Sequence, residues 1–285
     1  MPKLPKTSTS SRTIPVRDLT PEAFADFGEV IQNPLTHNGS PSLQKVEANQ
    51  GSAIKWLDIT KMRNFYESSS SKKPARVSMN MFVCKPRYLE QREGKDVFPV
   101  RILERHPFTP QTFIPMGLGK EDKGTCYLVI VAPTLPLSSS RDTDSLEPAY
   151  PLAPPRRKRS LRERLLGARP NPFTNDFGSS TTSAAISSSD EPRPKGPGLP
   201  DLKNIRAFIA RGDQAVTYGP GTWHAPMVVL GEKAIKFVVV QYANGVAVED
   251  CQEVEIEARD GEEGLVVDVG EVAGGQPEVS PRAKL

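Results

Sequence analysis

Two histidines of this 285-residue chain lie in segments that are rich in other residues able to do chemistry. His106 follows Glu104 by two positions in the segment ILERHPFTPQTFIPMG, residues 102–117. Side chains two apart on a strand project from the same face, so the carboxylate and the imidazole would lie side by side. His224 lies in YGPGTWHAP, residues 218–226, directly after a turn of Pro and Gly. Imidazole and carboxylate groups transfer protons near neutral pH and bind divalent metals, so the two segments predict one acid–base or metal site.

The segments that must position these residues have the pattern of a β-rich protein. Side chains of two kinds alternate along residues 76–84, which is the period of a strand with two distinct faces. Thr20-Pro21-Glu22 starts a short helix, because it offers a cap residue and a proline at the first helical position, and Gly28 ends it. Many short strands with little helix predict a barrel or a sandwich. Further strands are expected at 97–103, 111–115, 125–131, 206–210, 215–218, 234–242 and 253–256.

Both histidine segments resemble the two motifs of cupins. In the first motif Glu104, His106, Gln111 and Gly117 hold the four expected places, and in the second His224 holds the place of the histidine ligand. The resemblance implies a mainly β, cupin-like double-stranded β-helix barrel with a short N-terminal helix. It allows a divalent transition metal bound by Glu104, His106, Gln111 and His224, without making any cofactor certain. Glutamine is a poor ligand and only two imidazoles remain, so we expect weaker metal binding than in a standard cupin.

The composition divides the chain into one domain and three segments outside it. Residues 12–134 and 201–256 carry the core pattern and form a single cupin-like domain. Residues 135–200 contain 11 of the 28 prolines and few apolar residues, which predicts a disordered insertion rich in Pro, Ser and Arg. We expect a disordered tail at 1–11 and a flexible, Gly- and acid-rich tail at 257–285.

The charge of the chain argues against a nucleic-acid partner. The 135–200 insertion holds 10 Lys/Arg and 7 Asp/Glu, a net charge of +3 that equals the net charge of the whole chain. The domain itself is therefore close to neutral. No apolar run approaches the roughly 20 residues of a membrane span, and the three cysteines form no CxxC pair, so neither a membrane partner nor a disulfide framework is expected.

Three longer strings are similar to the ureidoglycolate lyase family: TPEAFADFGEVI, ERHPFTPQTFIPMG and PDLKNIRAFIARGDQAVTYGPGTWHAP. The resemblance covers roughly residues 13–134 and 200–256. Bacterial members lack the insertion, which indicates a eukaryotic, fungal-type member. The family implies a carbon–nitrogen lyase of the amidine-lyase type that cleaves ureidoglycolate to glyoxylate and urea in allantoin and purine degradation. It also implies a homodimer.

The reaction that the resemblance implies needs a base, an acid and a cation. We expect His106 or Glu104 to be the base toward the substrate hydroxyl and His224 to be the acid toward the urea nitrogen. If a metal binds, these residues become its ligands and other groups must move the protons.

Four further residues are candidates for binding or turnover of the substrate. Lys236 and Arg206 are candidate anchors of the carboxylate, and Lys236 is grouped with the catalytic residues. Lys236 lies between apolar residues in 234–242, so a solvent-facing lysine is the alternative. Asn80 would bond the ureido group or be an ordinary amide of the barrel interior, and Gln111 would bind substrate.

Two other functions fit the same residues. One is a metal-dependent cupin isomerase or dioxygenase, which the small number of histidines disfavours. The other is a cupin-like binding module without enzymatic activity, whose basic insertion recruits a partner.

The chain ends Ala283-Lys284-Leu285, a close variant of the Ser-Lys-Leu peroxisomal signal. This ending predicts import into peroxisomes by the receptor that reads such C-termini, with the cytoplasm as the alternative location.

Overall fold

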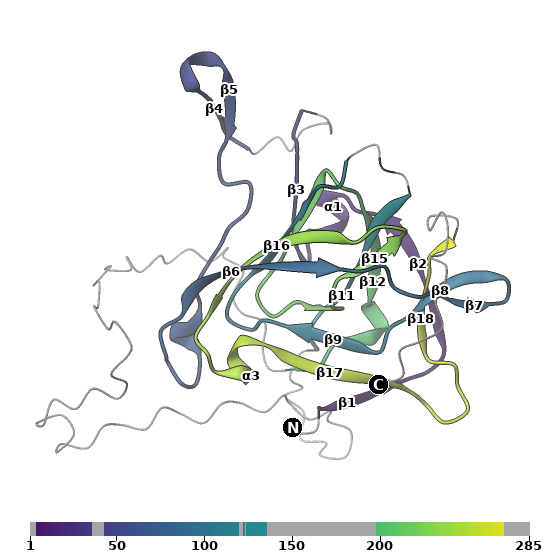
Figure 1. Cartoon of the computed structure of the whole chain (residues 1–285). Coiled ribbons are helices and arrows are strands. Elements are labelled where there is room, and N and C mark those ends of the chain that lie inside the picture. Colours follow the sequence, from purple (N-terminus) through teal and green to yellow (C-terminus); the bar gives the residue numbers. More distant parts are fainter. Residues whose placement is uncertain (1–3, 36–42, 120–121, 123, 136–197, 271–285) are drawn as a thin grey trace, which may run out of the picture.

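The computed structural model describes residues 4–35, 43–119, 122, 124–135 and 198–270, and strands dominate them (Figure 1). In these residues the larger sheet has the order β1-β17-β9-β14-β11-β12-β2-β18-β8-β7, and β15 also pairs with β11. The mainly β prediction is confirmed. The strands of the larger sheet are β1 (Lys6–Thr9), β2 (Arg12–Asp18), β7 (Glu90–Arg92), β8 (Lys95–Pro99), β9 (Ile102–Arg105), β11 (Thr125–Ala132), β12 (Arg206–Ala210), β14 (Trp223–His224), β15 (Val228–Gly231), β17 (Gln252–Ala258) and β18 (Leu265–Asp268).

A second sheet faces the first and has the order β3-β13-β10-β16-β6. It consists of β3 (Gly28–Gln32), β13 (Gln214–Tyr218), β10 (Gln111–Met116), β16 (Ile235–Ala243) and β6 (Arg76–Cys84). A two-stranded hairpin, β4 (Lys45–Ala48) and β5 (Ala53–Trp56), projects from the body (Figure 1). The helical elements are short: α1 (Pro21–Phe24), α3 (Ala247–Asp250), and the 3-10 turns η1 (Asn49–Gly51), η2 (Tyr66–Ser68) and η3 (Leu202–Asn204). In the part of the chain that the structure describes, no helix is long and apolar enough to cross a membrane.

Strand β11 separates two hydrophobic cores, because its side chains alternate between its faces and all are buried. Tyr127 and Val129 contribute to the core between the two sheets, which Phe113, Phe208 and Phe237 also fill. The residues between them, such as Leu128 and Ile130, pack on the opposite side of the larger sheet. The two-sided burial explains why the β11 sequence is a continuous apolar run.

The domain extends beyond the expected boundaries at both ends. β1 pairs with β17, although residues 1–11 were expected to be a disordered tail. β18 pairs with β2 and β8, although 257–285 was expected to be a flexible tail, and its Val267 is 0% exposed. β18 has only three apolar residues and lies among Gly and acidic residues, so the composition of the segment does not reveal it, which explains the error. Residues 136–197 of the expected insertion and 271–285 of the expected tail lie outside the described residues.

The predicted N-terminal helix exists but is shorter than expected. The Thr20 hydroxyl accepts a hydrogen bond from the Ala23 N–H at 3.2 Å, as the cap prediction requires. The helix ends at Phe24, and Gly28 instead begins β3 at φ 155°. A Cβ at Gly28 would lie 1.9 Å from the Thr217 carbonyl oxygen, so the close pairing of β3 with β13 requires glycine.

Candidate active site

Two strands of the larger sheet place Glu104 and His224 next to each other. Glu104 in β9 and His224 in β14 are direct partners in the antiparallel register. His224 is also the partner of Val131, whose side chain belongs to the core between the two sheets. Partners in register project from the same face, so both functional side chains point between the sheets. Leu103 packs in the opposite core, as the alternation along β9 requires.

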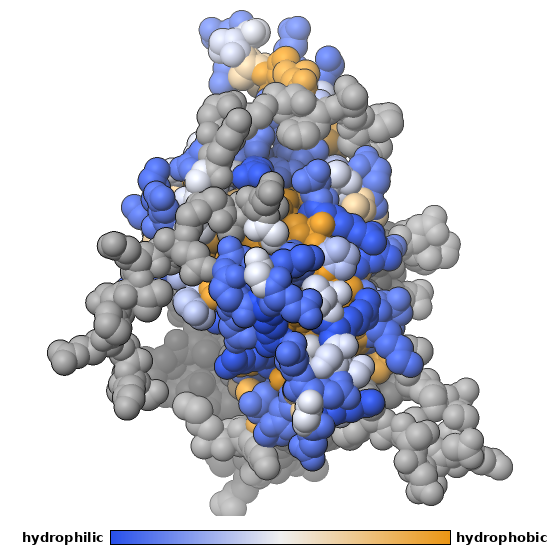
Figure 2. Space-filling model, turned by 90° about the vertical axis from the view of Figure 1, so that its right-hand side faces the viewer, coloured by the Kyte–Doolittle hydropathy of each residue, from blue (hydrophilic) through white to orange (hydrophobic). Residues whose placement is uncertain are grey.

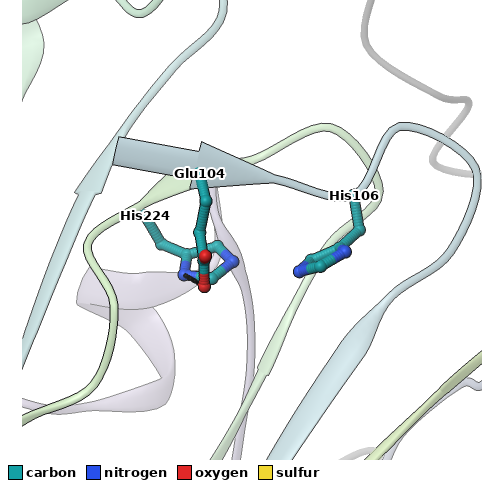
Figure 3. Close-up of side chains that lie close together, drawn as sticks. All are labelled: Glu104, His106 and His224. Carbon is teal, nitrogen blue, oxygen red and sulfur yellow. Dashed lines mark ion pairs between the residues drawn. The ribbon is translucent and has the colours of Figure 1, made fainter. Parts of the chain in front are cut away.

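His106 completes a compact group just after the end of β9. One ligand atom from each of Glu104, His106 and His224 lies within 4.8 Å of the others. The centroids of the two imidazole rings are 5.7 Å apart, and His224 Nδ1 is 3.8 Å from Glu104 Oε1. Figure 3 shows the three side chains converging on one space from different segments. The sequence prediction that these residues form one group is therefore confirmed.

A backbone carbonyl fixes the tautomer of His106. The Nδ1–H of His106 donates to the Asp250 carbonyl oxygen at 2.6 Å, because a carbonyl can only accept. The other ring nitrogen, Nε2, is buried and has no partner among the described residues. Burial lowers the pKa of His106, against the opposing effects of Asp250 and the neighbouring Gln111 side chain. Burial therefore favours the uncharged imidazole, in which Nδ1 carries the hydrogen and Nε2 carries the lone pair.

His224 is held in the same state by different contacts. Its ring stacks on Tyr218, with centroids 4.0 Å apart and an interplanar angle of 1°. Nδ1 lies 3.1 Å from the Ala225 carbonyl oxygen, whereas the buried Nε2 has no partner in the described part of the chain. Burial, followed by the neighbouring His106, lowers the pKa of His224 to about 3. At neutral pH this ring is uncharged.

Glu104 and Gln111 add two oxygen atoms of different character. Burial, and then the charge of Glu253, raises the pKa of Glu104 to about 7, so this carboxyl holds a proton over much of the neutral range. The Gln111 Nε2 donates to Gln241 Oε1 at 2.7 Å. The Gln111 Oε1 is buried and, within the described residues, without a hydrogen-bond partner.

Three acceptor atoms, His106 Nε2, His224 Nε2 and Gln111 Oε1, are thus buried and unsatisfied in one region. Folds rarely leave such atoms without a partner, so the region fits a ligand that brings a cation or several N–H and O–H donors. Two imidazoles and the Glu104 carboxylate are donors suited to a divalent transition metal. Gln111, the fourth predicted ligand, keeps its oxygen available for the same purpose.

The predicted carboxylate anchors do not join this group. Lys236 is exposed, and its register partners Met116 and Val83 place it on the outer face of the smaller sheet. Arg206 lies with its guanidinium 5.3 Å from the ring centroid of Phe27 and 3.5 Å from a carboxylate oxygen of Asp26. The solvent-facing alternative for Lys236 is the one that the structure favours, because its neighbours Ile235 and Phe237 are buried.

Asn80 lies on the inner face of β6, at the open edge of the smaller sheet. It is the register partner of Val239, whose side chain is in the core between the sheets. Its Nδ2 donates to the Ser78 hydroxyl at 3.0 Å, and the side chain is exposed. Asn80 is therefore an exposed inner-face residue at the edge of the sheet, and its role as a ureido ligand remains a prediction.

Sequence reasoning missed three residues that shape the group. Tyr218 stacks on His224 and is the register partner of Gln111, and its place in the YGPG turn was the available signal. Gln241 holds the Gln111 amide, and an amide within an apolar strand could have been noticed. Asp250 acts through its backbone carbonyl, which leaves no signature in a sequence.

The segments that carry this group lie within a region that matches known proteins. A family model described as Ureidoglycolate lyase matches residues 11–260. A ureidoglycolate lyase of Schizosaccharomyces pombe is 30% identical over 242 residues, which is 85% of this chain and 91% of that protein. The ureidoglycolate lyase of Saccharomyces cerevisiae is 30% identical over 81% of this chain and 86% of its own length. One of Burkholderia mallei is 25% identical over 80% of this chain and 82% of its own length. The chain belongs to the ureidoglycolate lyase family.

Proposed function

We propose that this protein cleaves ureidoglycolate into glyoxylate and urea, as a step in allantoin and purine degradation. Membership of the family supports the activity, and one observation supports its location. His106 Nε2, His224 Nε2 and Gln111 Oε1 are buried acceptors that no described residue satisfies. Ureidoglycolate carries a hydroxyl and several N–H groups, so it brings the donors that this space lacks.

The reaction moves one proton and breaks one bond. In ureidoglycolate a single carbon bears a hydroxyl, a carboxylate and a urea nitrogen. The hydroxyl proton leaves, its O–H electron pair forms the carbonyl of glyoxylate, and the carbon–nitrogen electron pair stays with nitrogen. That nitrogen gains a proton and departs as urea, so atoms and charge balance. The site must supply a base and an acid.

The geometry supports His106 as the base and Glu104 as the acid. His106 directs the lone pair of Nε2 into the space, because Nδ1–H is bonded to Asp250. Glu104 holds a proton near neutral pH, since its pKa is raised to about 7. His224 was the expected acid, but its pKa is lowered to about 3, and the one N–H of the uncharged ring lies at Nδ1 beside the Ala225 carbonyl, so it is not offered to the substrate. His224 Nε2 instead accepts from the substrate.

A divalent transition metal is the alternative occupant of the same atoms. Glu104, His106 and His224 would hold it, and it would supply positive charge to the substrate carboxylate and the developing oxyanion. Metal analysis of the purified protein, followed by chelation and readdition of Mn²⁺, Zn²⁺ or Ni²⁺, separates the two forms. Activity that survives complete chelation supports proton transfer by the side chains alone.

The activity is tested by supplying ureidoglycolate and measuring urea, glyoxylate and ammonia. We expect equal amounts of urea and glyoxylate and no ammonia, because a hydrolase acting on this substrate would release ammonia. Arg101→Gln, an exposed residue that pairs with Glu90, is a control that should match the unmodified protein. The absence of glyoxylate would contradict the proposal and leave the isomerase, dioxygenase or binding-module functions.

We further propose that the protein is a homodimer joined through the outer face of the smaller sheet. β6 is the edge strand of this sheet. Apolar residues on neighbouring strands are register partners across the outer face, for example Ile114, Val238 and Met81 on β10, β16 and β6. Exposed apolar side chains of this extent mark interaction surfaces in soluble proteins. The face contains Val77, Met79, Met81 and Val83, which are 56–69% exposed, with Ile114 and Met116 beside them.

The projecting hairpin supports the same association. Val46 of β4 and Ile54 of β5 are 44% and 50% exposed, and Figure 2 shows apolar surface on this hairpin at the top of the molecule. By contrast, the face of the body shown in Figure 2 is mainly hydrophilic. Sedimentation should give a dimer at micromolar concentration, and the double variant Met79→Glu, Met81→Glu should give a monomer. Tyr88→Glu, at a residue that is 62% exposed, should remain dimeric.

Peroxisomal import, with its receptor as a partner, is proposed from Ala283-Lys284-Leu285 alone, since these residues lie outside the described part. A fluorescent protein fused to the N-terminus should give punctate signal that becomes diffuse when Leu285 is removed. Diffuse signal in both fusions would place the protein in the cytoplasm.

A further inference from the structure

The proposed substrate carries a carboxylate that the histidine group does not bind through its own side chains. His106 and His224 direct Nε2 atoms without a partner in the described residues toward this space, and Glu104 adds a carboxyl group. An anion is bound best by a cation with several N–H donors, above all by arginine. Lys236 and Arg206 lie elsewhere, so the cation must come from another residue.

A row of polar side chains leads from the buried group to the open edge of the smaller sheet. It begins at Gln111, whose amide donates to Gln241 in the next strand. Gln241 is the register partner of Ser78 in β6, so both project from the inner face. Ser78 accepts a hydrogen bond from Asn80 at 3.0 Å. The inner face of β6 thus carries exposed or half-buried side chains at the open edge of the sheet, where this polar row ends.

Arg76 begins β6 on this inner face, two residues before Ser78. It is the register partner of Ala243, and the next residue, Asn244, donates its N–H to the Asp250 carboxylate at 2.8 Å. Asp250 is the residue whose carbonyl holds His106. Figure 1 shows α3 at the end of the sheet where β6 begins. Arg76 therefore lies at the end of β6 that is connected, through Asn244 and Asp250, to His106.

The charge of Arg76 is available for a ligand. The side chain is exposed, and in the described residues it makes no ion pair or hydrogen bond. The Asp250 carboxylate at the end of this connection already accepts from Tyr66, Asn244 and Gly245. Arg76 is the one cation among the inner-face residues of β6, which continue with Ser78, Asn80, Phe82 and Cys84.

We propose that Arg76 binds the carboxylate of the substrate, which leaves the ureido end to Gln111 and Gln241. Alternate residues on a strand are about 6.6 Å apart, a distance that an extended arginine side chain spans, so the guanidinium reaches the space above Ser78. The assignment rests on the proposed lyase function and names the part of the substrate that this edge of the smaller sheet binds. It also orients the hydroxyl-bearing carbon toward His106, because carboxylate and hydroxyl share that carbon.

The test compares Arg76→Met and Arg76→Lys with the control Arg101→Met. Carboxylate binding contributes equally to the substrate complex and the transition state, so we expect KM to rise at least ~30-fold in Arg76→Met while kcat changes less than ~3-fold. Arg76→Lys should recover part of the loss, since it keeps the charge without the fork of donors. Melting temperature should match the unmodified protein in all three variants.

Product binding separates recognition of the carboxylate from a structural role and from the reaction itself. Calorimetric titration with glyoxylate should show at least ~10-fold weaker binding to Arg76→Met, and titration with urea should show no change. An unchanged KM and unchanged glyoxylate affinity would overturn the assignment, as would a parallel loss of urea binding and melting temperature. If the unmodified protein fails to cleave ureidoglycolate but binds glyoxylate through Arg76, the lyase proposal fails and the carboxylate site stands.

Discussion

Two groups of buried polar residues lie next to each other in this protein and differ in whether their polar atoms have hydrogen-bond partners. The group around α3 is closed: the Glu249 carboxylate accepts from the Ser71 N–H at 2.8 Å, the Ser71 hydroxyl at 2.6 Å and the Asn244 amide at 2.7 Å. The histidine group is open, with unsatisfied acceptors on His106 and His224. Both are buried, so exposure does not account for the difference.

The contrast indicates which group stabilises the fold and which does chemistry. An unpaired buried polar atom costs about 1–3 kcal/mol, so a fold keeps several together only where something else completes them. Asp250 joins the groups, because its carboxylate belongs to the closed group and its carbonyl holds His106. The closed group thereby positions a residue of the open one.

The largest expected effect is the loss of activity on replacing His106 or His224 by Ala. In His106→Ala turnover should fall at least ~100-fold, the usual contribution of one acid–base group, and in His224→Ala it should fall less, because His224 only accepts a hydrogen bond from the substrate. The free energy of unfolding should also fall, because the His106 hydrogen bond to Asp250 and the stacking of His224 on Tyr218 are lost, so activity is measured at a temperature where the variants are folded. Steady-state kinetics and thermal melts of the same samples measure both quantities. Full activity in both variants would remove the site assignment.

The second expected effect is on stability and concerns Glu249. Glu249→Ala leaves buried donors of Ser71 and Asn244 unpaired, so the free energy of unfolding should fall by about 2–3 kcal/mol. Urea titrations measure it, with the exposed Glu232→Ala as the matched control. Kinetics at a temperature where the variant is folded should be changed far less than in the histidine variants.

The pH dependence of this effect has a definite sign. Burial alone would raise the pKa of Glu249, but hydrogen bonds from Ser71 and Asn244 outweigh it and lower the pKa below the ordinary value of 4.5. Stability from a lowered carboxyl pKa is present above the unfolded value and is lost as the pH falls through the folded value. The difference between Glu249→Ala and the unmodified protein should therefore shrink in acid. A difference that grows in acid would show that the carboxylate does not stabilise the fold.

The sequence predicted the parts of the site that local periodicity controls. Glu104 and His106 share a face because strands alternate, and His224 follows a recognisable turn. The same alternation did not decide whether Lys236 faces the site or solvent. A lysine between two buried residues can be placed only when it is known which face of the strand points to the core. Arg76 lies on the inner face of the sheet because β6 pairs with β16, where Ala243 is its partner. Ala243 is 167 positions away along the chain, so no local pattern shows this pairing.

The boundaries of the fold were harder to predict than its class. Short strands alternating with turns sufficed for a mainly β protein, and 76–84 is β6 as expected. β18 was missed because both of its faces are buried: Leu265, Val266 and Val267 are at most 3% exposed, so they form one short apolar run instead of an alternating pattern. Composition averaged over a tail therefore hides a strand that tertiary pairing creates.

The smallest expected effect follows from deletion of residues 138–197, which lie outside the described residues. Thr134 and Pro200 form an antiparallel bridge, and the Leu135 N–H donates to the Leu199 carbonyl at 2.9 Å. The chain therefore leaves and re-enters the domain at one point, and a short Gly-Ser linker can replace the segment, because shortening a loop has a small entropic effect. Melting temperature and KM should both remain close to those of the full chain. A loss of activity at unchanged melting temperature would show that the deleted segment contributes to the histidine group. A loss of both activity and melting temperature would show that the segment stabilises the fold.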